Sequence, residues 1–162
     1  MRHRLAAALL LAACAGAGRQ TGSTDAPVPA TVSREHLRAL QWLEGRWATE
    51  RNAYLTTYLE FTFTSDTSLQ LRLFESRAFT DPYNTFALAM TGGRLLARSG
   101  RREWLATRLD STGVRFVSTA GDVYEGLAIR RLDPDRARIE IRWRFESGQA
   151  ETRTVTARRV PR

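Results

Sequence analysis

The sequence contains no lysine, one cysteine and two histidines among its 162 residues. A single cysteine cannot form an internal disulfide, which excludes a disulfide scaffold, and a zinc ribbon would also need more thiols. All 25 basic residues are arginine, and they alternate with 17 acidic residues along the chain instead of forming one block. Scattered charge is typical of a solvated surface. Despite a formal charge of +8, we therefore expect no nucleic-acid partner, while anionic lipid head groups remain compatible partners.

The shortage of histidine and cysteine also removes the usual catalytic constellations. Neither a Ser-His-Asp nor a Cys-His arrangement has a full set of candidates, and no Gly-x-Ser-x-Gly or phosphate-cradling glycine loop occurs. Four carboxylates fall in expected strands without a pair on one wall, namely Glu60, Glu75, Glu125 and Glu140. We interpret them as exposed groups facing arginines. The sequence therefore predicts a protein that is not an enzyme, with no cofactor and no metal site.

The first residues have the pattern of a secretory signal peptide. A basic start at Arg2-His3-Arg4 precedes an apolar run over residues 5–13, which is too short to span about 30 Å of hydrocarbon. The run ends in Leu11-Ala12-Ala13-Cys14, which resembles the lipobox of bacterial lipoproteins. That resemblance implies cleavage after residue 13 and lipid attachment at Cys14, and hence a protein anchored in the bacterial cell envelope and facing the periplasm. An ordinary signal peptide is the alternative.

The next segment has the composition of a flexible tether. Residues 14–31 are mostly Gly, Ala, Ser, Thr and Pro, and a segment so poor in apolar side chains cannot offset the entropy of its own ordering. We therefore predict a signal peptide over 1–13, a tether over 14–31 and one globular domain over 32–162.

A helix is expected at the start of the domain. Ser33 is a suitable N-cap with Glu35 in the first turn, and leucines at 37, 40 and 43 recur at helical spacing. Gly45 can adopt the left-handed conformation that ends a helix. The pattern predicts about three helical turns.

After the helix the chain alternates apolar and polar residues in short runs separated by turns. The clearest are Leu55 to Phe63 and Ile139 to Phe145, in which every second residue is apolar or is threonine. Nine or ten such runs joined by tight turns require antiparallel neighbours, and closure removes exposed strand edges. We predict an all-β fold, an antiparallel up-and-down β-barrel of about eight to ten strands with the short N-terminal helix closing one end. A two-sheet sandwich is the alternative.

The junction of helix and first strand resembles the N-terminal signature of the calycin superfamily. Its positions match a Leu-x-Trp-Leu-x-Gly-x-Trp run at Leu40, Trp42, Leu43, Gly45 and Trp47. The resemblance to bacterial lipocalin-like domains implies that Trp47 plugs the closed end and that Arg158 or Arg159 packs over its ring. Nitrobindin-like barrels share the motif and hold haem through a histidine of a late strand, a position that neither His3 nor His36 occupies.

The inward side chains leave two functions open. A barrel of about eight strands either fills its interior or leaves room for one small ligand. The candidate ligand-lining residues are Phe61, Phe63, Leu71, Phe86, Met90, Phe116 and Trp143. The first hypothesis is an envelope-anchored, lipocalin-like lipoprotein that binds a small hydrophobic ligand. The alternative is a tethered, non-catalytic interaction or structural module with a filled barrel, which would dock a protein through arginine faces and the Asp81–Asn84 loop.

Overall fold

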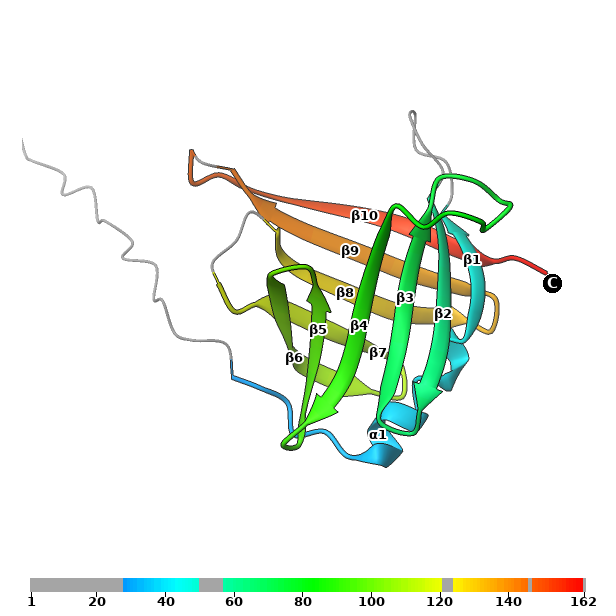
Figure 1. Cartoon of the computed structure of the whole chain (residues 1–162). Coiled ribbons are helices and arrows are strands. Elements are labelled where there is room, and N and C mark those ends of the chain that lie inside the picture. The colour runs from blue at the N-terminus through cyan, green and yellow to red at the C-terminus, as the bar shows by residue number, and fades with distance from the viewer. Residues whose placement is uncertain (1–27, 50–56, 121–123, 146, 162) are drawn as a thin grey trace, which may run out of the picture.

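The protein is a closed β-barrel of ten antiparallel strands, and the predicted fold class is confirmed. The computed structural model describes residues 28–49, 57–120, 124–145 and 147–161. Its elements are α1 (Arg34–Arg38), the 3-10 helix η1 (Gln41–Leu43), β1 (Gly45–Thr49), β2 (Tyr58–Ser65), β3 (Ser68–Phe74), β4 (Asn84–Thr91), β5 (Arg94–Ser99), β6 (Arg102–Asp110), β7 (Gly113–Ser118), β8 (Tyr124–Asp133), β9 (Arg136–Arg144) and β10 (Ala150–Arg159). Each strand pairs with the next along the chain, and β10 returns to pair with β1 (Figure 1). None of the helices described is long and apolar enough to cross a membrane.

The alternation of apolar residues sets the inner face of the barrel. Leu59 and Phe61 of β2 are buried, as are Leu69 and Leu71 of β3, and the paired residues Phe61 and Leu71 share a face. Ile139 of β9 lies opposite Ile129 of β8 in the same way. Because side chains on a strand alternate between faces, these positions converge on one core inside the barrel.

The N-terminal helix is shorter than the predicted three turns. α1 ends at Arg38 and a single 3-10 turn follows over residues 41–43. Leucines at 37, 40 and 43 are 0%, 0% and 2% exposed. Their spacing of three matches the three residues per turn of a 3-10 helix, which keeps successive leucines on one side better than the 3.6 of an α-helix. The prediction of Ser33 as N-cap agrees with the structure, where its Oγ accepts a hydrogen bond from the His36 backbone N–H at 3.4 Å.

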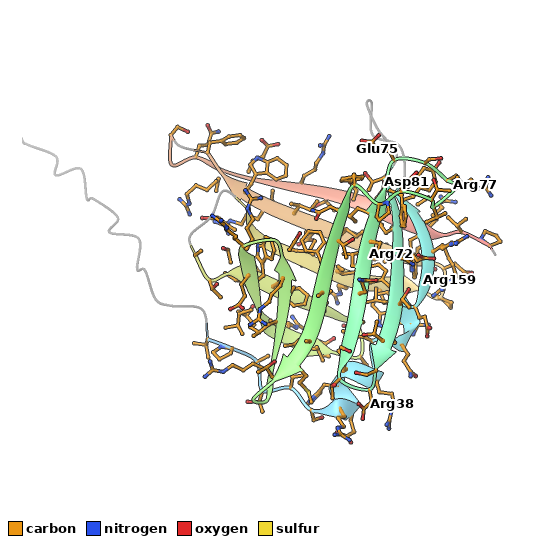
Figure 2. The ribbon with its side chains drawn as sticks, in the orientation of Figure 1. Arg38, Arg72, Glu75, Arg77, Asp81 and Arg159 are labelled. Atoms are coloured by element: carbon orange, nitrogen blue, oxygen red, sulfur yellow. The ribbon has the colours of Figure 1, made fainter. Side chains whose placement is uncertain are left out.

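The two ends of the barrel differ. The closed end carries α1, η1 and the turns at 66–67, 92–93, 111–112 and 134–135, whereas the open end carries the connections at 75–83, 100–101 and 145–149. Figure 2 shows Glu75, Arg77 and Asp81 on the connection between β3 and β4, with Arg38 at the opposite end. The N-terminal helices therefore cover one end of the interior, and none of the described helices lies at the other end.

The connection between β3 and β4 packs on the outside of the barrel, which the sequence did not indicate. Phe79, 8% exposed and with φ of 55°, meets Phe74 and Tyr58 edge-on at centroid distances of 5.2 and 5.7 Å. The guanidinium of Arg46 lies 4.5 Å from the Phe79 ring centroid. This outer aromatic cluster holds the loop against β2 and β3.

The structure differs from the sequence prediction at Phe145 and at the start of the domain. Phe145, expected inside the barrel, is 45% exposed because β9 ends at Arg144 and the chain beyond it turns back into β10 at the open end. At the N-terminal side, Ala30 N–H already donates to Ala106 O at 2.9 Å, so the chain contacts the barrel before residue 32. The signal peptide, Cys14 and most of the tether lie outside the described residues, and their assignments stay predictions.

Candidate functional site in the lumen of the barrel

The interior of the barrel contains a cavity of about 690 Å³. Most of its wall is apolar and comes from strands all around the ring, including Leu59, Leu73, Ile129, Ile139, Ile141 and Val155. A cavity of several hundred Å³ with apolar walls has the size and lining of a small-molecule site. We refer to this cavity as the lumen.

Four of the seven candidate lining residues lie on the lumen wall: Phe61, Leu71, Phe86 and Phe116. Phe63 and Met90 are not among the residues that line it, and both pack instead against the core cluster near the closed end. Trp143 is not among them either. Its ring meets Phe145 edge-on, at a centroid distance of 6.5 Å, beside the open end. Alternation identifies the inward face of a strand. Whether an inward side chain lines the cavity or packs in the core depends on its position along the barrel axis, which alternation does not give.

The closed end is filled by the N-terminal segment. Leu40 and Leu43 pack against inward side chains of the strands, and the void that they help to line is about 10 Å³, no more than one water could occupy. Trp47 is 1% exposed, and its indole N–H donates to Leu43 O at 2.7 Å. Trp42 packs edge-on against Trp47, with the ring centroids 6.2 Å apart. The lumen therefore has a floor built from the same residues that carry the calycin resemblance.

Of the two arginines left open by the sequence, Arg159 is the one over the Trp47 ring, with its guanidinium carbon 4.4 Å from the centroid. Its Nη1 donates to Glu44 O at 2.7 Å and its Nη2 donates to Trp42 O at 2.6 Å. Gly45 has φ of +111°, and a Cβ there would lie 3.1 Å from Arg159 Nη1. A side chain at residue 45 would therefore both strain the backbone and crowd the guanidinium.

The described polar side chains of the lumen wall lie towards the open end. Thr49 Oγ1 accepts from Thr57 N–H at 2.8 Å. Asn84 Oδ1 accepts two hydrogen bonds, from Thr85 N–H at 2.8 Å and from Ser99 Oγ at 2.7 Å. Together with Tyr83, the exposed residues Arg101, Arg102 and Arg153 complete this part of the wall. We refer to Arg101, Arg102 and Arg153 as the mouth arginines.

Sequence reasoning missed the mouth arginines because arginine was assigned to outer faces. Arg153 pairs with Ile141 across β9 and β10, and it shares the inward register of Val155 and Ala157. Arg102 pairs with Ser99, which also lines the lumen. Arg153 lies two residues before the inward Val155, and residues two apart on a strand share a face. This relation identifies an inward arginine only when the register of β10 is known.

Outside the lumen, two of the four strand carboxylates pair with arginines, as the sequence suggested, but their side chains are not exposed as predicted: Glu60 is 14% and Glu125 is 21% exposed. Glu60, on the outer wall, lies between Arg46, at 2.9 Å, and Arg72. Glu125 accepts from Arg142 at 3.0 Å and from Arg144. Within the described ranges no three His, Cys, Asp or Glu side chains gather as metal ligands would. The chemistry that the lumen offers is therefore apolar burial with hydrogen-bond donors at one end.

The clearest displaced pKa belongs to a turn at the closed end. Hydrogen bonds from the Thr112 side chain and backbone lower the pKa of Asp110 to about 2, with a smaller contribution from Arg108. The pKa of Asp133 is lowered by its hydrogen bond with Arg136, in the turn between β8 and β9. Both groups stabilise turns, and neither lines the lumen.

No protein-family model matches the chain, and no curated protein is detectably similar to it. The ten-stranded antiparallel barrel is consistent with a lipocalin-like fold.

Proposed function

We propose that the protein is a lipocalin-like binding protein, anchored in the bacterial envelope, that carries one small hydrophobic ligand in its lumen. The observation that supports this proposal is the cavity of about 690 Å³, which lies in the range of 300–1,000 Å³ typical of ligand pockets. A barrel kept only as a scaffold would be expected to fill this space, because empty apolar volume forfeits packing energy.

The proposed anchor adds a reason for the architecture. Acylation at Cys14 would hold the barrel beside a bilayer, where hydrophobic molecules are concentrated, and several acyl chains bind a membrane far more firmly than one. The calycin-like positions at the closed end support the same class of protein. These residues close that end of the barrel, so we expect the ligand to enter and leave at the open end.

Dye uptake tests the binding proposal. The full chain with Cys14→Ala, which cannot be acylated, is titrated with Nile red, an uncharged dye whose fluorescence rises in apolar surroundings. Saturable uptake of about one dye per chain is expected. The alternative, a filled interaction module, predicts no uptake, and that result would overturn the carrier proposal.

A matched pair of variants tests whether the dye binds in the lumen. Ala97 lines the lumen on β5, whereas Ala87, its near neighbour on β4, is exposed on the outer face. Ala97→Phe should occupy lumen volume and weaken dye binding about tenfold or more. Ala87→Phe adds the same ring outside and should leave binding unchanged. Equal losses in the two variants would locate the dye elsewhere.

Anchoring is tested separately. Cells expressing the chain are fed an alkyne-tagged fatty acid, and the wild-type chain should incorporate the tag and sediment with membranes. Cys14→Ala should do neither. Tag incorporation by Cys14→Ala, or none by the wild type, would refute the lipoprotein assignment while leaving the lumen proposal to the dye experiment.

A further inference from the structure

The lumen is polarised along its axis. Its deep wall consists of aliphatic and aromatic side chains such as Phe61, Phe116 and Ile139, whereas its polar side chains lie at the open ends of their strands. A molecule that is apolar throughout would displace water from these polar groups without offering them hydrogen bonds of its own. An amphiphile that enters tail first would place its head group among them instead.

The charged side chains on the described part of the lumen wall have one sign. The described residues lining the lumen include the mouth arginines and no aspartate or glutamate. Arg153 lies on β10, and Arg102 begins β6, directly after the turn that ends β5. In the ring order β10-β9-β8-β7-β6, β6 is the fourth strand from β10, and the fifth strand would be directly opposite in a ring of ten. Arg102 and Arg153 therefore lie on nearly opposite sides of the lumen. Positive groups on opposite sides of a low-dielectric cavity focus their field on its mouth.

The hydrogen-bonding groups at the same level favour an acceptor ligand. Guanidinium groups donate and cannot accept. The carbonyl oxygen of Asn84 already takes hydrogen bonds from Thr85 N–H and Ser99 Oγ, which fixes its side-chain amide with the NH₂ group as the remaining donor. Donors and positive charge at one level suit a carboxylate or a phosphate, whose hydrogen bonds to arginine are charge-assisted.

We infer that the ligand is an amphiphile with an anionic head group, bound with its apolar tail towards Trp47 and its head group among the mouth arginines at the open end. This inference rests on the proposed function and adds the class of ligand and its orientation. The exposure of the mouth arginines fits a head group that stays in contact with water while the tail is buried.

Matched ligands test the inference. On the full chain with Cys14→Ala, bound Nile red is displaced by dodecanoate, dodecyl phosphate, dodecanol and dodecyltrimethylammonium, with the charged amphiphiles below their critical micelle concentrations and dodecanol below its solubility limit. The four share one tail and differ in head group. Both anions should displace the dye at about tenfold lower concentration than dodecanol, the cation should be weakest, and the advantage of the anions should shrink as salt is added.

Arginine variants locate the head group. Arg153→Gln and Arg102→Gln should each reduce the preference for dodecanoate over dodecanol several-fold and leave dodecanol binding unchanged. Arg138→Gln, an equal loss of charge at an exposed position of β9, should change neither value. Thermal melts check that all three variants are folded, and each of the two mouth variants gives an independent reading if the other fails to fold.

The outcomes separate the inference from the proposed function. If all four amphiphiles displace the dye equally, or if Arg138→Gln acts like Arg153→Gln, the head-group site is wrong and the apolar carrier stands. If neither dye nor amphiphile binds, the carrier proposal itself fails.

Discussion

The closed and open ends of the barrel are built from the same ten strands and differ in what fills them. At the closed end, Leu40, Leu43 and apolar side chains of the strands leave an empty volume of only about 10 Å³. Towards the open end, a cavity of about 690 Å³ remains and arginines line its wall. The two ends differ because the N-terminal segment packs its side chains into the closed end only.

This comparison separates stability from binding. Buried apolar contacts and satisfied carbonyls at the closed end contribute to the free energy of unfolding, whereas side chains around an open cavity have fewer neighbours to lose. Substitutions at the closed end should therefore lower stability, and substitutions at the open end should change ligand affinity.

Trp47→Ala should cause the largest loss of stability. The ring is 1% exposed, packs against Trp42 and Arg159, and donates to a backbone carbonyl, so its removal should cost about 3–5 kcal/mol of unfolding free energy. Urea denaturation measures the loss. Trp143→Ala, at the half-buried tryptophan near the open end, should cost only about 1 kcal/mol. Similar losses for the two tryptophans would contradict the division.

Arg159→Lys should have the second-largest effect. Lysine keeps the charge but cannot reproduce a planar fork that donates to both Glu44 O and Trp42 O while lying over Trp47. A loss of about 2 kcal/mol is expected, from the two hydrogen bonds and the cation-π contact. Arg94→Lys, at an exposed position where β5 begins at the same end, serves as control and should be neutral in the same denaturation experiment.

The smallest expected effect is a pH dependence carried by Asp110. Its pKa of about 2 in the folded state is below the usual value of about 3.9 in an unfolded chain. The stabilisation is therefore complete above pH 4 and lost as the pH falls towards 2. The carboxylate is 38% exposed, so solvent screening limits the effect to about 1 kcal/mol or less.

Asp110→Asn removes the titrating group without changing the size of the side chain. Thermal melts between pH 5 and pH 2 should show a shallower fall in stability for this variant than for the wild-type chain. An unchanged slope would mean that other carboxylates carry the acid sensitivity.

Much of the fold was readable from local patterns. The alternation in β2, β3 and β9 identified the buried faces, and Ser33 identified the start of α1. The helix length was overestimated because Leu37, Leu40 and Leu43 fit a spacing of 3.0 as well as 3.6 residues per turn. Phe79 was missed because its partners Tyr58 and Phe74 become neighbours only when β2 and β3 pair.

The candidate site was partly readable. Phe61, Leu71, Phe86 and Phe116 were selected by alternation and line the lumen. Phe63, Met90 and Trp143 satisfy the same alternation but lie at other heights, which periodicity does not report. Arg153 was overlooked because an inward position and an outward one look alike until the strand is placed in register.

The sequence by itself determined the all-β class, the antiparallel order of short strands and the apolar side of most of them, because strand period and turn chemistry are local properties. Tertiary structure alone decided that the ring closes with ten strands, that Arg159 covers Trp47, and that a cavity remains towards one end. These features depend on which side chains meet across the barrel, and that is fixed by register and closure instead of by neighbours along the chain.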